Sequence, residues 1–132
     1  MTVLAPDAAP IMASAEKATP SAYPAHANVL ALVSAYQDKT HEPMPWNVLV
    51  DAVARLQQAN SDAALPVYGS ARAIDTLSDI VTDLRRLALV NLGPRGTTLT
   101  PAAKSVVQTW NGEFKRRSER ASDALTRVGI LA

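Results

Sequence analysis

Few side chains of this chain could act as acids, bases or metal ligands. His26 and His41 are its only histidines, and neither stands near a patterned serine, aspartate or glutamate. They lack the four-residue spacing that lets two histidines of one helix share a zinc ion. The absence of cysteine excludes thiolate metal sites, disulfides and cysteine nucleophiles, and no nucleophile elbow or phosphate-binding loop motif occurs. We therefore expect both histidines on loops, in a protein that is not an enzyme and uses no metal or cofactor.

A second set of residues, basic or hydroxyl-bearing, could instead contact a nucleic acid. Side chains of these types read base edges and hold phosphates. Four of them fall on the polar face of a helix expected over 76–88, one falls in the turn that follows, and two flank the helix, where they could clamp a phosphate backbone. The seven candidates are Arg72, Ser78, Thr82, Arg85, Arg86, Arg95 and Lys104.

Acidic residues in the same segment oppose this interpretation. Asp75, Asp79 and Asp83 are expected on or near the outward face of the helix, where they would repel phosphates. The formal net charge of the whole chain is only +1. Any contact with a polyanion must therefore come from a local basic patch.

The helix over 76–88 that would position these residues is strongly patterned. Five large apolar residues recur at three- and four-residue steps and form one face: Leu77, Ile80, Val81, Leu84 and Leu87. Thr76 suits the N-cap position, and Asp79 three residues later approximates a capping box.

A small hairpin and a further helix are expected after it. Residues 88–90 and 97–99 are short extended segments around a Gly93–Gly96 turn. Thr100 then suits an N-cap, with Pro101 at the first helical position, where a missing N–H costs nothing. The order is helix, two-stranded hairpin, helix.

This region resembles winged helix-turn-helix proteins. Residues 83–90, DLRRLALV, are similar to the end of a recognition helix and the first wing strand of that superfamily. Residues 99–104, LTPAAK, are similar to the LTPxG junction after the wing of MarR-type regulators, with Ala103 where glycine is common. The resemblance implies a mainly α fold with a small β-hairpin wing, a winged helix-turn-helix plus a C-terminal helix. It also implies double-stranded DNA as a partner, with the polar face of 76–88 in the major groove and Arg95 supporting it from the wing.

Two earlier helices, over 28–38 and 46–58, would complete the three helices of such a domain. The second begins after Pro45 and includes Trp46, which we interpret as a core anchor, the alternative being a platform for a ligand. Residues 60–73 form an unusually long connection for a helix-turn-helix. A second register therefore stays open, in which 46–58 is the first helix and a short second helix lies in 70–75.

The last helix, from about Glu113, has an apolar stripe and a basic face. The stripe, Phe114, Ala121, Leu125 and Val128, suits the seam of a homodimer. The basic face, Lys115, Arg116, Arg117 and Arg120, is either solvated or a contact for DNA or an acidic partner.

These elements give three parts: a flexible Ala/Pro-rich arm over 1–26, a winged-helix domain over 27–108, and a C-terminal helix over 109–132 that could mediate dimerisation. The arm either has no function of its own or wraps around a binding partner. No apolar run reaches the roughly 20 residues of a membrane span, and the beginning of the sequence lacks the order of a secretory signal. We expect a cytoplasmic protein without membrane contact.

Two functions are consistent with these features. The first is a small dimeric DNA-binding regulator of transcription. The alternative is a winged-helix module that binds protein within a larger assembly, using its acidic helix face and basic tail as complementary docking surfaces.

Overall fold

The computed structural model describes residues 24–59, 61, 73–110 and 112–132. Within these residues the chain is mainly helical with one small antiparallel sheet, as the sequence predicted. The elements are α2 (Pro24–Thr40), α3 (Trp46–Gln58), α4 (Ala73–Arg86), β1 (Val90–Gly93), β2 (Gly96–Leu99), α5 (Pro101–Gln108) and α6 (Glu113–Arg127). Residues 1–23 of the predicted arm lie outside the described residues, and so do residue 60 and residues 62–72 of the predicted 60–73 connection. Residues 24–26 form the first turn of α2, so the predicted end of the arm at residue 26 is wrong.

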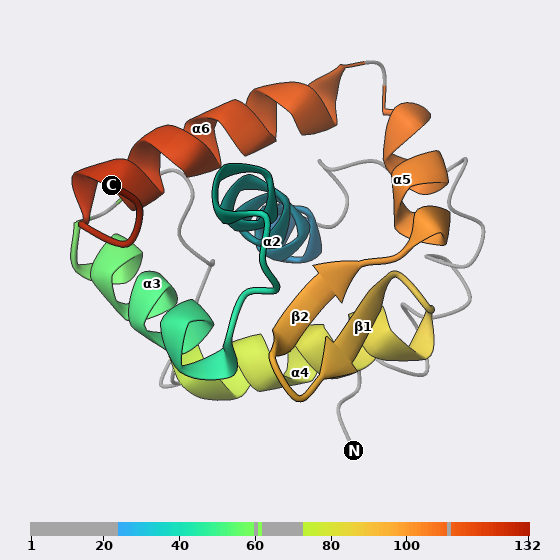
Figure 1. Ribbon diagram of the computed structural model, residues 1–132, viewed down its shortest axis with the longest axis horizontal. Coiled ribbons are helices and arrows are strands. Elements are labelled where there is room, and N and C mark those ends of the chain that lie inside the picture. Colours follow the sequence, from blue (N-terminus) through green and yellow to red (C-terminus); the bar gives the residue numbers. More distant parts are fainter. Residues whose placement is uncertain (1–23, 60, 62–72, 111) are drawn as a thin grey trace.

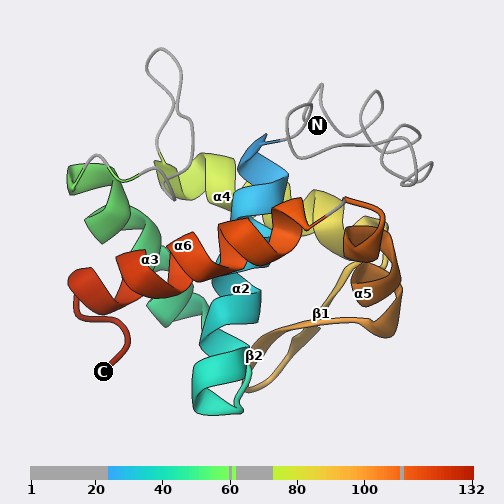
Figure 2. The same ribbon diagram turned by 90° about the horizontal axis from the view of Figure 1, so that it is seen from above.

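Helix α2 is the centre of the molecule. Figure 1 views it nearly end-on, with α6 along one side, α4 along the opposite side, α3 beside both and the hairpin on the remaining flank. The view in Figure 2 shows α6 crossing over α2. In α2, four large apolar residues are completely buried: Val29, Leu30, Leu32 and Val33. Helix α2 is therefore buried on more than one side, since neighbours surround it.

Helices α3 and α4 follow the predicted apolar patterns. The bounds of α3 coincide with the predicted 46–58, and Leu49, Ala52, Val53 and Leu56 are its buried residues. Helix α4 buries Leu77, Ile80, Val81 and Leu84. It begins at Ala73, so Thr76 lies inside the helix and the predicted N-cap is wrong.

The β1–β2 hairpin is joined to the connection between α2 and α3. Its register pairs Val90 with Leu99 and Leu92 with Thr97. On the other edge of β2, Met44 N–H donates to the Thr97 carbonyl at 3.0 Å and Thr97 N–H donates to the Met44 carbonyl at 2.8 Å. Met44, in the short α2–α3 connection, thereby forms an isolated antiparallel bridge with β2 on the edge opposite β1.

Thr100 ends the hairpin and begins α5. Its hydroxyl accepts a hydrogen bond from Ala103 N–H at 3.1 Å and donates to the Ala88 carbonyl at 2.6 Å. The first bond confirms the predicted N-cap, with Pro101 at the start of the helix. The second bond joins Thr100 to Ala88, two residues after the end of α4. It therefore holds the two ends of the hairpin together between α4 and α5.

Helix α6 crosses α2 of the same chain and packs against it (Figure 2). Ala121 and Leu125 of its apolar stripe are buried, and Phe114 and Val128 are partly buried against the core. The stripe that suited a homodimer seam is therefore occupied by a neighbour within the chain. In the described ranges, no helix has both the length and the apolar character needed to cross a membrane.

Candidate nucleic-acid interface

The outward face of α4 carries the four candidate residues that the sequence placed there. Ser78, Thr82, Arg85 and Arg86 are all exposed. The Thr82 hydroxyl donates to the Ser78 carbonyl at 2.8 Å, which uses its hydrogen and leaves its oxygen free to accept. The two arginines lie in the last turn of the helix. There the negative end of the helix dipole stabilises them.

The hairpin turn and α4 lie at opposite ends of α2. In Figure 1 the turn is drawn in front of α4 at the lower edge, and Figure 2 shows that the two are separated along α2. Arg95 lies in this turn and is exposed, and its Nη2 atom is 3.5 Å from Glu42 Oε1. Because both side chains face solvent, this ion pair is weak, and a phosphate could replace the carboxylate.

The other two candidates do not join this surface in the described structure. Lys104 is exposed on α5, which begins at the end of β2 away from the hairpin turn (Figure 1). Arg72 lies outside the described residues. The structure thus brings together four of the seven candidates on one helix face, and Arg95 lies apart from them on the hairpin turn (Figure 2).

Asp83 does not face outward with the other acidic residues of the segment. It is 3 % exposed, so its expected repulsion of phosphates is wrong, whereas Asp79 is exposed as expected. The sequence contained the signal: Asp83 lies three residues after Ile80 and four before Leu87, the spacing of the apolar face. Burial of this carboxylate leaves the exposed end of α4 more positive than the sequence suggested.

His26 is the partner of this buried carboxylate. It lies in the first turns of α2 and is 3 % exposed, so the expectation that it lies on a loop is wrong. Its Nε2 atom is 3.4 Å from Asp83 Oδ2. Burial lowers the pKa of His26, and the hydrogen bond and charge of Asp83 oppose that shift without cancelling it. His41 lies just after the end of α2, as expected of a histidine outside the helices.

The basic residues of α6 are partly neutralised within their own helix. Glu113 contacts Arg116 at 3.0 Å, Arg117 at 3.2 Å and Arg120 at 3.7 Å. The hydrogen bond from Arg116 holds the pKa of Glu113 below its usual value, and the three positive charges add to this shift. Arg117 also donates to Asn28 Oδ1 at 2.6 Å, which ties α6 to α2. The one carboxylate of Glu113 thus offsets one of the four positive charges of the predicted basic face.

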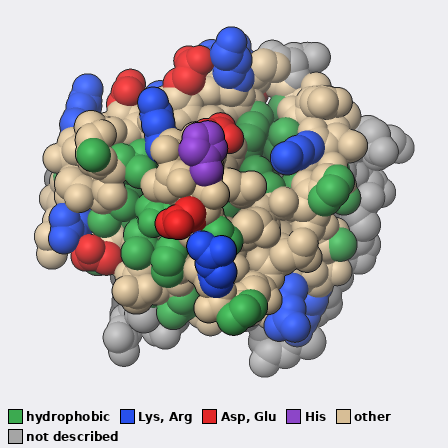
Figure 3. All heavy atoms as spheres, in the orientation of Figure 1, with side chains coloured by type: hydrophobic (Ala, Val, Ile, Leu, Met, Phe, Trp, Pro, Cys, Tyr) green, Lys and Arg blue, Asp and Glu red, His purple; other side chains and the backbone are tan. Residues whose placement is uncertain are grey.

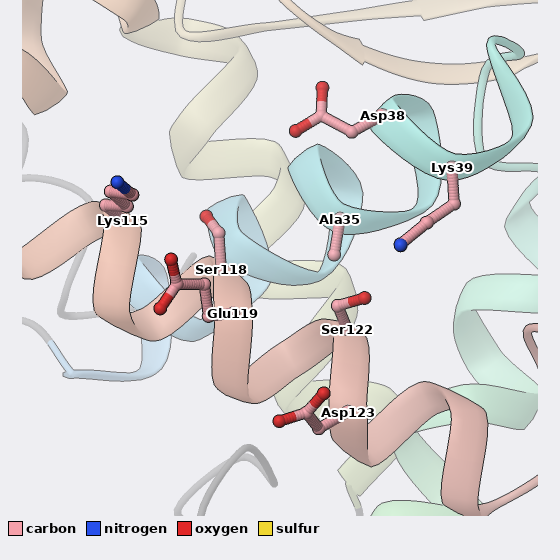
Figure 4. Close-up of a pocket in the computed structure, with 8 residues that line it drawn as sticks. All are labelled: Ala35, Asp38, Lys39, Lys115, Ser118, Glu119, Ser122 and Asp123. Carbon is pink, nitrogen blue, oxygen red and sulfur yellow. The ribbon is translucent and has the colours of Figure 1, made fainter.

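A groove of about 420 Å³ lies between the C-terminal half of α2 and α6. Figure 4 shows its lining: Ala35, Asp38, Lys39, Lys115, Ser118, Glu119, Ser122 and Asp123. Three carboxylates and two ammonium groups share the groove. This mixture of signs provides no net attraction for phosphate, so the groove does not extend the α4 surface.

Two large apolar side chains remain exposed among the described residues. Trp46, at the start of α3, is 43 % exposed, and Leu92, on β1, is 45 % exposed. The interpretation of Trp46 as a core anchor is therefore wrong. It precedes the buried stripe of α3, whose first member is Leu49.

Charges are dispersed on the face of the molecule seen in Figure 3. Basic and acidic side chains alternate there, with apolar and neutral surface between them. Within the part of the chain that the structure describes, no cluster of three or more histidine, aspartate or glutamate residues is arranged to hold a metal ion. Comparison of the chain with protein-family models, with curated proteins and with solved structures gave no match.

Proposed function

We propose that the chain is a DNA-binding protein of winged-helix type that uses α4 as its recognition helix. One observation carries this proposal: Ser78, Thr82, Arg85 and Arg86 are exposed together on the face of α4 opposite its buried apolar stripe. Hydroxyl and guanidinium groups on one helix face are the donors that contact base edges and phosphates in a major groove. The hairpin turn that carries Arg95 would contact the backbone or minor groove at a separate point of the duplex.

The connectivity of the described elements supports the proposal. Three helices precede the hairpin among the described residues. Met44, in the connection between the first two helices, pairs with β2. A winged helix has this order, in which the third helix is presented to DNA and the hairpin flanks it. The apolar stripe of α4 is buried and its polar face is exposed, as a recognition helix requires.

The charge distribution sets the expected character of binding. The α4 face and the hairpin turn offer three arginines and few other cations, and the net charge of the chain is small. We therefore propose modest affinity for duplex DNA that falls steeply with salt, with a slope of roughly 0.9 per phosphate contact on logarithmic axes. Regulation of transcription is the role that such a module would serve.

A titration of labelled duplex DNA at low and then rising salt tests this proposal. The full chain should shift the anisotropy of a mixed-sequence duplex of about two helical turns, and added salt should reverse the shift. The absence of any shift at low salt, with the chain folded by circular dichroism, would refute DNA binding. A mass measurement in solution on the same sample tests dimerisation, which would need a surface other than the buried Ala121 and Leu125 stripe.

A second function, docking of a protein partner, is favoured by one observation. Trp46 and Leu92 are large apolar residues left nearly half exposed, and exposed aromatic residues are common anchors of protein interfaces. Capture of one stoichiometric protein partner that is lost on Trp46→Ala, without bound nucleic acid, would support this alternative over DNA binding.

A further inference from the structure

The buried His26–Asp83 pair joins the beginning of α2 to the end of α4. Both side chains are 4 % exposed, and the two residues are 57 positions apart in the sequence. Asp83 lies in the last turn of α4, between Thr82 and Arg85 of the proposed DNA-binding face but on the opposite side of the helix. One polar contact between this helix and α2 thus lies next to the residues that would touch DNA.

Burial is the main influence on the charge state of His26. His26 is the third residue of α2, where the positive end of the helix dipole also disfavours an imidazolium. The stable arrangement is a neutral imidazole whose Nε2–H donates to Asp83. Burial lowers the pKa of His26 further, and Asp83 only partly opposes this.

Among the described residues packed around α2, α6 contributes Arg117. This residue donates to Asn28, two residues beyond His26, and is itself paired with Glu113. The shift in the His26 pKa comes from burial and from Asp83, not from this cation. Strand β2 contains no titratable residue between Gly96 and Leu99. The remaining charged residues of α2 and of the described side chains of α4 are exposed: Asp38, Lys39, Asp79, Arg85 and Arg86.

We propose that protonation of His26 unseats the C-terminal part of α4 from α2, so that mild acid weakens the DNA contacts made by that helix. Because the effect of burial outweighs that of Asp83, a charged His26 is more stable where water reaches it, which requires the two helices to separate. Since its folded pKa is lowered, the opened form binds the proton more readily, and closure loses stability as the pH falls below 6.5, the ordinary histidine value. The DNA consequence rests on the proposed function, whereas the opening does not.

Amide hydrogen exchange of the full chain, measured at pH 7.5 and 5.5 and corrected for intrinsic rates, tests the opening. The opening constant of the α4 amides should rise in acid by up to about tenfold per pH unit, the limit for one proton. The variant His26→Gln keeps a side-chain N–H for Asp83 but cannot titrate, so its α4 protection should not change with pH. The control variant His41→Gln, at the exposed histidine, should behave like the wild type. Equal α4 protection at both pH values in the wild type, or the same acid response in His26→Gln, would overturn the proposal.

Two further measurements distinguish a failure of the proposed helix opening from a failure of the proposed DNA binding. A proton NMR titration of the His26 ring in the wild type needs no variant, and a midpoint at or above 6.5 would overturn the proposal even if His26→Gln does not fold. Anisotropy with a mixed-sequence duplex at constant ionic strength should show weaker binding at pH 5.5 for the wild type and unchanged binding for His26→Gln. If the wild type binds at neither pH, the proposed function fails, and the exchange data still decide the opening.

Discussion

Gly96 lies against the backbone of Met44 where the α2–α3 connection meets the hairpin. Its φ angle is +139°, and a Cβ atom added there would overlap the Met44 carbonyl and lie 2.7 Å from the Pro45 nitrogen. The neighbouring Thr97 exchanges two backbone hydrogen bonds with Met44. The hairpin can approach the connection this closely only because position 96 has no side chain.

Substitution Gly96→Ala should therefore separate the hairpin from the connection. We expect a loss of about 2–4 kcal/mol in the free energy of unfolding, from backbone strain and from the displaced Met44–Thr97 hydrogen bonds. The control is Gly93→Ala in the same turn, where a new Cβ would lie 3.8 Å from the Gly96 carbonyl, an ordinary contact. It should cost less than about 1 kcal/mol. Urea unfolding of both variants checks this, and equal losses would show that the close approach does not matter.

Trp46 should contribute little to stability for its size. Because 43 % of it is exposed, Trp46→Ala should cost about 1 kcal/mol. Leu49→Ala, which empties a fully buried position on the same helix, should cost about 2–5 kcal/mol. Unfolding measurements compare the two. A larger loss at Trp46 than at Leu49 would place the tryptophan in the core after all.

Glu113 should titrate below the ordinary glutamate value of 4.5, chiefly because Arg116 donates a hydrogen bond to it. With its folded pKa lowered, the contribution of Glu113 to stability is complete above 4.5 and is lost as the pH falls through the lowered pKa. Arg116→Ala should raise that pKa more than Arg120→Ala, whose charge acts from 3.7 Å. Carbon NMR titration of the carboxyl measures both shifts. A larger effect of Arg120→Ala would refute this ranking.

Local features of the fold were predictable because neighbouring residues determine them. The apolar spacing over 46–58 gave the bounds of α3, and Thr100-Pro101 gave the start of α5 with its cap. The beginning of α4 was misplaced because Thr76 has the chemistry of a cap, whereas the helix continues back to Ala73. A capping side chain marks where a helix can begin, and tertiary packing decides whether it does.

Contacts between distant residues could not be predicted in the same way. Met44 pairs with Thr97 and His26 with Asp83 across more than fifty positions, and no local spacing specifies such partners. The stripe of α6 was recognised correctly, but its pattern is the same whether it covers α2 or a second copy of the chain. The exposed α4 face was predictable from periodicity, except for Asp83, whose position on the apolar side was overlooked.

The central claim is that the exposed face of α4 binds duplex DNA. The most direct measurement compares the salt-dependent affinity of the double variant Arg85→Ala/Arg86→Ala with that of Arg127→Ala, which removes an exposed arginine from α6 on the other side of α2. The α4 variant should lose about tenfold or more in affinity, and its salt slope should fall by roughly 0.9 for each lost phosphate contact. The α6 variant should stay within about twofold of the wild type. Equal losses in the two variants, or no loss in the α4 variant, would contradict the claim.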